Sequence, residues 1–244
     1  ATFSVEGSYV LRLTADDGAL ISSDILIVTV NPAGPGSLQA YSYPPINGYD
    51  QPGPGINLFN LTAEGTADWA HWGLDSPTSF NRKTGIQQIS NFTQAGTGTI
   101  QQDAGIISLN RSLFSWSDGS PIASVTNTST GVNAATLNDG LSITVPADTT
   151  LRTLKVYVAL SAARGRFEAS MSDGSVPLFS DTSQVSPGSY ERVFVLVYRA
   201  GTSGQTLTAR WTLETALSQS STVSLRAATL GADRVINLLQ AAHG

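Results

Sequence analysis

Hydrophobic and polar residues alternate along much of the chain, which is the period of β-strands rather than of helices. Residues 154–160 and 207–213 place an apolar side chain at every second position, and residues 223–227 repeat the pattern. Each such run predicts a strand with one buried face. Residues 193–198 are apolar on both faces, which predicts a central strand.

Turn sequences separate these runs, and they share a glycine preceded by aspartate or proline: Asp118-Gly119, Asp139-Gly140, Asp173-Gly174 and Pro187-Gly188. Short strands spaced by such turns predict an all-β fold, a β-sandwich of jelly-roll type. We expect this main domain to cover residues 57–231. Residues 232–244 would form a tail with a short helix over residues 233–242.

Residues 1–32 carry a separate pattern of strand, turn and strand. Tyr9, Leu11 and Leu13 alternate with their neighbours, Asp16-Asp17-Gly18 interrupts the run, and residues 25–30 are nearly all apolar. This predicts a β-hairpin. A hairpin alone is marginally stable in water, so we expect it to need partner strands.

Proline, glycine and tyrosine are concentrated in residues 33–56. Proline cannot donate a hydrogen bond to a strand ladder and glycine weakens one, so this segment is predicted to be an extended linker. Tyr41, Tyr43 and Tyr49 either stack on a ligand or hold the linker against a domain, and we favour the second interpretation.

The residues of the first segment also carry a resemblance. Gly7 to Gly18, followed by Val28 to Pro32, resembles the closing strands of a PKD-type or cadherin-like immunoglobulin-fold repeat of bacterial exocellular proteins. The resemblance covers about the last third of such a repeat. It implies that residues 1–32 are a partial immunoglobulin-like β-hairpin segment.

A second resemblance covers the main domain. Three segments resemble a jelly-roll module appended to large secreted bacterial proteins that are polysaccharide-active or surface-associated: residues 60–73, residues 143–158 and residues 169–175. The resemblance implies architecture and compartment more strongly than activity.

The charge composition limits the partners. The chain has 13 Lys and Arg against 18 Asp and Glu, and charged residues make up only 13% of it. Without a basic run, a net charge of −5 repels phosphate backbones, so we expect no nucleic-acid partner. No apolar run of about 18 residues is present, which predicts no membrane span.

Cysteine is absent, which excludes a thiol nucleophile, a disulfide framework and a cysteine metal site. Ala1 begins almost directly in strand-like sequence, as expected of a mature product or a part of a longer chain. Together with the two resemblances, this predicts a secreted, extracellular or cell-surface location.

Tryptophan and histidine gather in residues 68–73. On a strand, Trp69 and His71 would point to one face and Asp68 and Trp72 to the other, leaving one tryptophan buried and the other available. Exposed indole rings stack on sugar C–H faces, and nearby polar groups bond to hydroxyls. The alternative is a packed tryptophan pair with His71 bonded to the backbone.

Trp116 lies beside a predicted turn, where ligand loops gather, or it forms an aromatic plug beneath that turn. Trp211 lies on an apolar strand face and is predicted to be core. The candidate ligand-binding residues are therefore Asp68, Trp69, His71, Trp72, Trp116 and Tyr157. At least two of the four aromatic rings Trp69, Trp72, Trp116 and Tyr157 should be exposed.

Catalysis and metal binding have weaker support. Glu64, Asp68, Asp75 and Asp118 could converge as a carboxylate pair for glycoside cleavage, but their spacing does not decide this, and we assign no catalytic residue. No cofactor is certain. A structural calcium ion is a candidate, because Asp16-Asp17, Asp118 or Asp173 could supply hard oxygen ligands, although Asp-Gly is also a common hairpin turn.

These observations favour a non-catalytic carbohydrate-binding or carbohydrate-associated module of a secreted multidomain bacterial protein. Its expected partners are a polysaccharide or glycan and other domains of the same polypeptide. A structural or adhesive spacer that binds no small ligand is the alternative. A polysaccharide-degrading enzyme is the third hypothesis.

Overall fold

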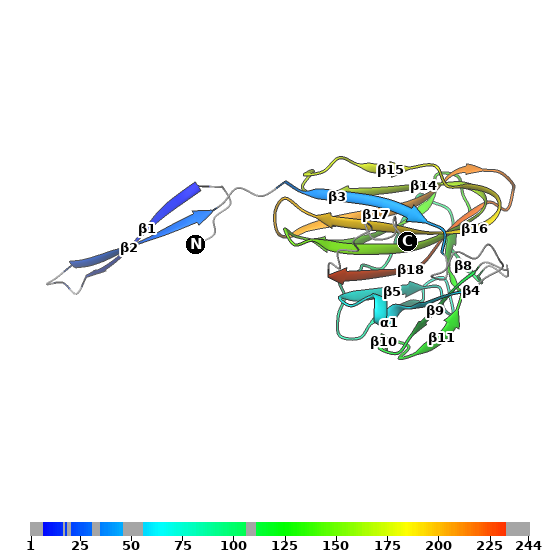
Figure 1. The fold of residues 1–244 in the computed structure, drawn as a ribbon, viewed down its shortest axis with the longest axis horizontal. Coiled ribbons are helices and arrows are strands. Elements are labelled where there is room, and N and C mark those ends of the chain that lie inside the picture. Colours follow the sequence, from blue (N-terminus) through cyan, green and yellow to red (C-terminus); the bar gives the residue numbers. More distant parts are fainter. Residues whose placement is uncertain are drawn as a thin grey trace, which may run out of the picture. The chain divides into compact units, whose positions relative to one another are not determined.

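The computed structural model describes residues 7–16, 18, 21–30, 35–45, 56–105 and 111–232. Its internal contacts divide the chain into two units, Ala1–Pro35 and Gly36–Gly244, which are drawn in Figure 1. Within the described part of the chain, no helix is long and apolar enough to cross a membrane.

The first unit contains the predicted hairpin. Strands β1 (Gly7–Asp16) and β2 (Ile21–Val30) pair antiparallel without a register shift, from Gly7 opposite Val30 to Asp16 opposite Ile21. Gly18 lies in the turn with φ +84°, a backbone conformation that favours glycine. Its place in an immunoglobulin-like repeat stays a prediction.

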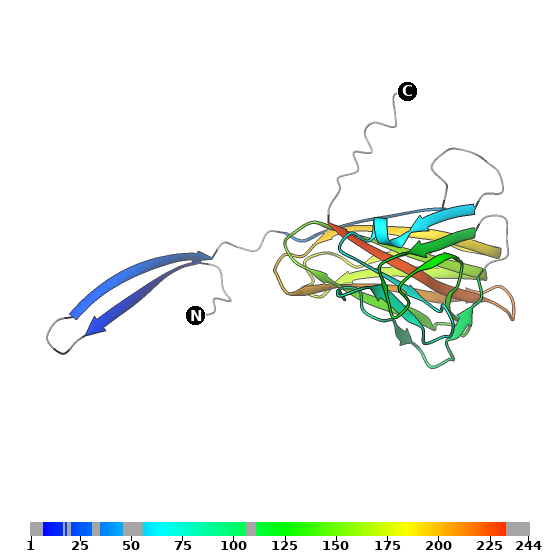
Figure 2. The same cartoon turned by 90° about the horizontal axis from the view of Figure 1, so that it is seen from below.

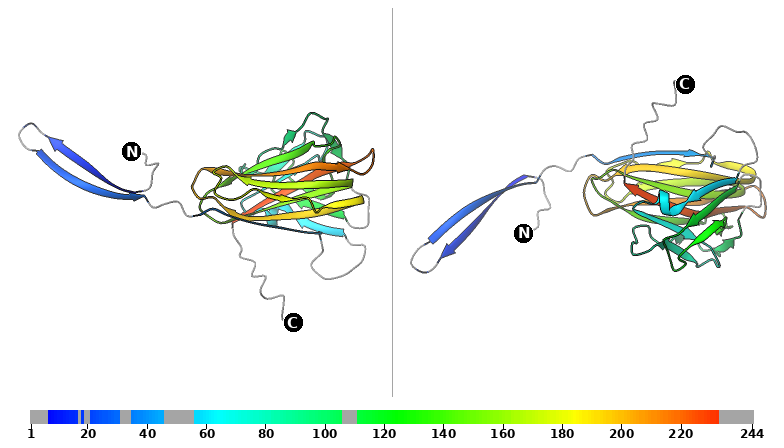
Figure 3. Two further views of the ribbon diagram at one scale, coloured as in Figure 1. Left: turned by 90° about the horizontal axis from the view of Figure 1, so that it is seen from above. Right: turned by 60° about the horizontal axis from the view of Figure 1, so that its bottom comes forward.

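The second unit is an all-β sandwich, as predicted. Its main sheet curls into two facing layers that share the long strand β14 (Arg152–Met171). Residues 152–161 of β14 pair with β16 and β18 in the front sheet, whereas residues 163–171 pair with β17 and β15 in the back sheet. The views from below and above show β14 and β16 running the length of this unit (Figures 2 and 3).

Each of the two layers has a defined order of neighbouring strands. The front sheet consists of β3 (Ser37–Tyr43), β16 (Val185–Arg199), the first half of β14, β18 (Thr222–Ala232), β5 (Asp68–Trp72), β6 (Phe80–Lys83) and β10 (Gly119–Ser120). The back sheet consists of β15 (Phe179–Asp181), the second half of β14, β17 (Gln205–Ala216), β13 (Gly140–Ala147) and β7 (Thr93–Ala95). Strand β12 (Gly131–Ala134) pairs with β18 and with β8 (Gln101–Asp103).

The main core fills the space between the two sheets. The alternation read from the sequence is confirmed, because Leu154, Val156 and Val158 on β14 belong to this core. Trp211 on β17 is 2% exposed, as predicted. Its ring packs near Phe167 and Phe194, which stack with their centroids 3.9 Å apart.

A third layer covers part of the outer face of the front sheet. Its strands β4 (Ile56–Asn60), β9 (Arg111–Trp116) and β11 (Val125–Thr128) form a separate small sheet in which β4 and β9 are parallel. A second core of buried residues, among them Trp69, Phe114 and Tyr157, lies between this layer and the front sheet. The one-turn helix α1 (Leu61–Glu64) follows β4 directly.

Three predictions need correction or lie outside the described residues. The prediction of a linker over residues 33–56 is wrong for Ser37–Tyr43. These residues form β3, which pairs with β16, so the sandwich begins well before residue 57. Pro187-Gly188 is not a turn but lies inside β16, where the pairing with β14 is irregular. The predicted helix over residues 233–242 falls outside the described residues.

Strand β14 changes sheets where its backbone is irregular. Ala162 has φ +45°, and register shifts occur between Ser161 and Ala163 and between Arg164 and Gly165. A side-chain carbon at Gly165 would overlap the ring of Trp211. Gly165 is therefore needed for the close approach of β14 to the core.

Replacement of Gly165 by alanine is expected to lower the free energy of unfolding of the sandwich by about 1–3 kcal/mol, the usual cost of overpacking a core. Tryptophan fluorescence during urea unfolding measures this, since all four tryptophans lie in the second unit. Gly188→Ala is the matched control, because its new carbon would meet nothing within 4 Å. Equal losses in both variants would contradict this role of Gly165.

Candidate functional site

Strand β5 carries the cluster of aromatic residues that the sequence singled out. The predicted alternation is confirmed: Trp69 packs in the second core under the third layer, and Trp72 packs in the main core between the two sheets. The predicted availability of one tryptophan is wrong. All five residues of β5 are buried, because the outer face of the front sheet is covered as well as the inner one.

All six candidate ligand-binding residues are interior. Asp68, Trp69, His71 and Trp72 are 0% exposed, Trp116 is 3% exposed and Tyr157 is 2% exposed. The expectation that at least two of the four aromatic rings are exposed is therefore wrong. Ligand binding at these six residues stays a prediction, and it would require the rings to leave the interior.

The indole nitrogens of these tryptophans have partners inside the protein. Nε1 of Trp72 donates to Asn91 at 3.0 Å, and Nε1 of Trp116 donates to the carbonyl of Ile122 at 2.9 Å. Nε1 of Trp69 donates to Asp118 at 2.8 Å. A buried tryptophan needs a hydrogen-bond acceptor for its indole N–H group, and here the protein supplies one in each case. This favours a packing role for the three tryptophans.

Asp118 joins the third layer, α1 and the front sheet. Besides Trp69, its carboxylate accepts a hydrogen bond from Thr62 at 2.5 Å and forms an ion pair with Lys83 at 2.8 Å. Burial acts to raise the pKa of Asp118, but the bonds from Lys83, Thr62 and Trp69 together outweigh burial and leave the pKa below its usual value.

Asp68 holds the loop that follows β6. Its carboxylate accepts the backbone N–H groups of Gln88 at 2.6 Å and Ile89 at 2.8 Å, and that of Trp69 at 2.8 Å. Burial raises the pKa of Asp68, and the three N–H donors oppose this rise only in part. The arrangement is that of a structural carboxylate.

His71 is a buried imidazole between aromatic rings. Its ring centre lies 5.1 Å from that of Trp116 and 5.9 Å from that of Phe114. Neither ring nitrogen makes a hydrogen bond of ordinary geometry, but the backbone of Thr130 lies close enough to interact with the ring. Burial and then the charge of Arg226 lower the pKa of His71 to about 3, and the interaction with Thr130 opposes this shift. His71 is therefore neutral at pH 7.

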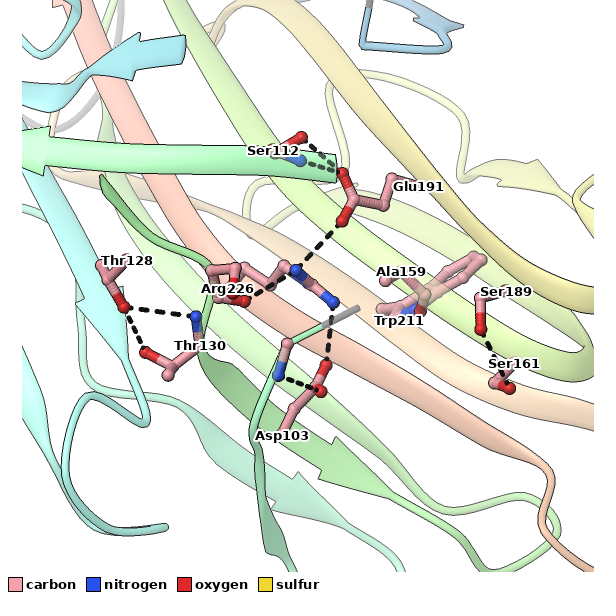
Figure 4. A network of polar contacts seen from close by, with 12 residues as sticks. Asp103, Ser112, Thr128, Thr130, Ala159, Ser161, Ser189, Glu191, Trp211 and Arg226 are labelled. Atoms are coloured by element: carbon pink, nitrogen blue, oxygen red, sulfur yellow. Dashed lines mark hydrogen bonds and ion pairs between the residues drawn. The ribbon is translucent and has the colours of Figure 1, made fainter. Parts of the chain in front are cut away.

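Arg226 is the centre of a buried polar network (Figure 4). It is the extra residue of a β-bulge in β18, because the adjacent pairs in the register with β14 are Val158 with Leu225 and Tyr157 with Ala227. Its guanidinium lies 3.0 Å from Glu191 and 3.1 Å from Asp103, and it donates to the carbonyl of Ser129 at 2.7 Å.

Glu191 extends this network to the third layer. Its second carboxylate oxygen accepts the backbone N–H of Ser112 at 2.7 Å and the hydroxyl of Ser112 at 2.5 Å. Ser112 belongs to β9, whereas Glu191 belongs to β16 of the front sheet. The network thus anchors the covering layer on the sheet, and it was not visible in the sequence because its members are far apart along the chain.

The candidate calcium ligands are engaged otherwise. Asp118 is paired with Lys83, and Asp173 accepts the backbone N–H groups of Ser175 at 2.9 Å and Gly201 at 3.0 Å. The side chains of Asp16 and Asp17 lie outside the described residues. Over the described residues, no group of three or more His, Cys, Asp or Glu side chains is placed to hold a metal ion.

Part of the outer face of the front sheet is exposed around Tyr41 of β3. Tyr41 lies opposite the buried Val195, which lies opposite Lys155, and the next row on the same face joins Gln39, Val197 and Thr153. We name the exposed Gln39 and Tyr41, the half-buried Thr153, Lys155 and Val197, and Glu64 at their border the Tyr41 face. Tyr41 is 39% exposed and is the only exposed aromatic residue among the described side chains.

A stacked tyrosine pair lies at the edge of this face. The rings of Tyr41 and Tyr43 are 6.5 Å apart between centroids and tilted by 29°. Tyr43 packs against the second core, so it supports the exposed ring of Tyr41 from one side. Both residues lie on a strand of the sheet and not on a loop, which fixes their positions.

Helix α1 brings a carboxylate to the same place. Asn60 caps the helix by accepting the N–H of Ala63 at 3.1 Å. One oxygen of Glu64 accepts bonds from Lys155 at 2.8 Å and from the hydroxyl of Tyr157 at 2.6 Å.

The shared carboxylate changes the acidity of both partners. Burial acts to lower the pKa of Lys155, but the charge and the hydrogen bond of Glu64, together with smaller contributions from Tyr43 and Tyr41, outweigh burial and raise it. Burial, and then Glu64, raises the pKa of Tyr157 well above its usual value. Lys155 is therefore a charged donor and Tyr157 a neutral one.

Tyr41 and Tyr43 lie on a strand and not in the linker that the sequence predicts. The signal that was available is the alternation of Leu38 and Ala40 with Gln39 and Tyr41, which is that of a strand with one buried face. Surrounding prolines and glycines obscured this pattern. Tyr49, the third tyrosine of the predicted linker, lies outside the described residues.

No family model matches the chain, and no curated protein matches it. Among solved structures, the chain is similar to the enzymatically active domain of tailspike protein 4 of bacteriophage CBA120, with a TM-score of 0.38 and 10% identity over 58% of this chain and 19% of that chain.

A second solved structure is the CBM36-1 domain of a multidomain xylanase from the hindgut metagenome of Trinervitermes trinervoides. Its TM-score is 0.29 and its identity 16%, over 59% of this chain and 100% of that chain. At these TM-scores neither similarity bears on activity. Function is therefore argued from this chain's own residues.

The neutral His71 makes the stability of the sandwich depend on pH. Its pKa is lower in the folded state than in the unfolded chain, so unfolding binds a proton and the stabilisation is lost as pH falls below about 6.5. We expect the free energy of unfolding to fall by about 1.4 kcal/mol per pH unit from there toward pH 5.

Urea unfolding followed by tryptophan fluorescence at several pH values measures this slope. His71→Leu should flatten the slope between pH 6.5 and 5, a window that lies above the usual pKa of carboxylates. An unchanged slope in the His71→Leu variant would show that His71 does not cause the dependence.

Proposed function

We propose that the sandwich is a non-catalytic carbohydrate-binding module and that a glycan binds at the Tyr41 face. The observation that carries this proposal is the exposed ring of Tyr41, stacked on Tyr43 at the open end of a rigid sheet. A sugar ring packs its C–H face on such an aromatic plane, while its hydroxyls need donors and acceptors at the rim.

The Tyr41 face supplies both kinds of contact. Val197 and the ring of Tyr41 offer apolar surface, and Gln39, Thr153 and Lys155 offer amide, hydroxyl and ammonium groups around it. These residues come from three neighbouring strands whose spacing is fixed by backbone hydrogen bonds. A preformed, weakly charged surface of this kind suits a ligand with many hydroxyls.

Three of the four carboxylates considered for catalysis are engaged in separate contacts, and among the described residues the structure records no contact of the fourth, Asp75, through its carboxylate. Glu64 holds Lys155 and Tyr157, Asp68 holds backbone N–H groups, and Asp118 holds Lys83. These contacts give each of the three carboxylates a structural role, which favours binding over turnover. A spacer without a ligand remains the alternative, and turnover of a glycan would support the enzyme hypothesis.

We also propose that this module belongs to a secreted or cell-surface bacterial protein with several domains. The support comes from the absence of cysteine, the two resemblances to modules of such proteins, and the division of the chain into two units. Detection of the native protein in culture medium or on the cell surface tests this part of the proposal.

A glycan array combined with pull-down on insoluble polysaccharides tests the binding function. We expect retention of the wild-type chain and a loss of affinity of at least about tenfold in Tyr41→Ala, because truncation of a central aromatic contact costs more than about 1.4 kcal/mol. Leu178→Ala is the control, since Leu178 is 61% exposed and lies beside β15 of the back sheet. Absence of wild-type retention on every glycan would favour the spacer.

A further inference from the structure

We infer that the Tyr41 face selects uncharged glycans and that Glu64 sets this selectivity by neutralising Lys155. The inference rests on the proposed function, because it concerns the ligand of the same face. Glu64 acts through Lys155 and is therefore a positioning residue. Three observations support the assignment.

First, the ammonium group on the Tyr41 face is not free. Its nitrogen lies 2.8 Å from Oε2 of Glu64, and both side chains are about one quarter exposed. In the sheet, Lys155 and Tyr41 lie in one row on the same face with the buried Val195 between them, so the ion pair and the exposed ring are two strands apart. A ligand seated on Tyr41 therefore meets a positive and a negative charge together, with no net charge.

Second, the carboxylate of Glu64 is held in place by a second donor. The hydroxyl of Tyr157 donates to the same oxygen at 2.6 Å, and Tyr157 is buried. Glu64 also lies on a capped turn of helix, which restricts its backbone. Such a carboxylate cannot easily swing away to free Lys155 for an anionic sugar.

Third, the other lysine and the arginine on this face of β16 lie further from Tyr41 than Lys155 does. Lys83, the other lysine of the chain, is paired with Asp118 at 2.8 Å and donates to the carbonyl of Gly65 at 3.2 Å. Arg199 is exposed on the same face of β16, about 7 Å along the strand from Val197 and about 13 Å from Val195, at 3.3 Å per residue. At physiological ionic strength, where the Debye length is about 8 Å, its charge acts only weakly on a ligand centred on Tyr41.

The consequence for ligands follows from desolvation. A uronate or sulfated sugar on Tyr41 would lose hydration of its charge without gaining an unpaired cation, which is unfavourable. A neutral sugar carries no charge, so it does not incur this cost of lost hydration. Its hydroxyls can donate to Oε1 of Glu64, which receives no hydrogen bond from the described residues, and can accept from Lys155.

Pull-down on neutral and on anionic polysaccharides, each at low and high salt, tests the inference. The wild-type chain should prefer neutral polysaccharides, with little dependence on salt. In Glu64→Gln, Lys155 is released while the amide oxygen can still accept from Tyr157. We expect the ratio of anionic to neutral binding to rise about fivefold at low salt, the effect of one unit charge at about 4 Å in water, and to fall back at high salt.

Further variants separate selectivity from a purely structural effect. Glu64→Asp keeps a carboxylate, so its ratio of anionic to neutral binding should stay close to that of the wild-type chain. The double variant Glu64→Gln with Lys155→Gln lacks the released lysine, so its ratio should not rise as in Glu64→Gln alone. Arg199→Gln should leave the ratio unchanged. Unfolding followed by tryptophan fluorescence verifies that each variant is folded.

The outcomes distinguish this inference from the proposed function. Salt-sensitive retention of the wild-type chain on anionic polysaccharides would overturn the inference and uphold carbohydrate binding. An unchanged ratio in a folded Glu64→Gln variant would also overturn it. No wild-type retention on any polysaccharide would overturn the proposed function itself, and the inference with it. If Glu64→Gln fails to fold, the comparison of neutral and anionic polysaccharides with the wild-type chain still tests whether the Tyr41 face selects uncharged glycans.

Discussion

The covering of the outer face of the front sheet by a third layer is the constraint on which the rest of this structure depends. A sandwich of two sheets leaves two outer faces to water, and aromatic residues on them would be exposed. Here β4, β9 and β11 bury a second core on one of those faces. The position at which this cover ends decides which side chains meet solvent, and it leaves Tyr41 outside and Trp69 inside.

The attachment of this third layer is polar as well as apolar. Ser112 of β9 bonds to Glu191, which pairs with the buried Arg226, and Asp118 joins Trp69, Thr62 and Lys83. Buried charges are tolerated when each has a partner, and these partners come from different layers. They therefore help to fix the register of the cover on the sheet, in addition to the contacts of the second core. His71, between them, is kept neutral by its burial.

The Tyr41 face owes its character to the same arrangement. Helix α1 follows the last residue of β4, so the end of the third layer also delivers Glu64 to Lys155. The result is an open surface with an aromatic plane, several hydrogen-bonding groups and a neutralised lysine. Its chemistry suits hydroxyl-rich ligands, and its rigidity comes from the strands that carry it.

The sequence by itself determined the all-β class, the first hairpin, the core position of Trp211 and the alternation along β5, because a period of two residues is a local property of the chain. It did not determine that Ser37–Tyr43 join the sheet, since prolines and glycines beside them resemble a linker while their pairing partner, β16, lies more than a hundred residues away. Nor did it show that both faces of β5 are covered. Whether the outer face of an alternating strand is buried depends on which other segments pack against it. Only the tertiary structure therefore decided that the tryptophans are interior and that Tyr41 is exposed.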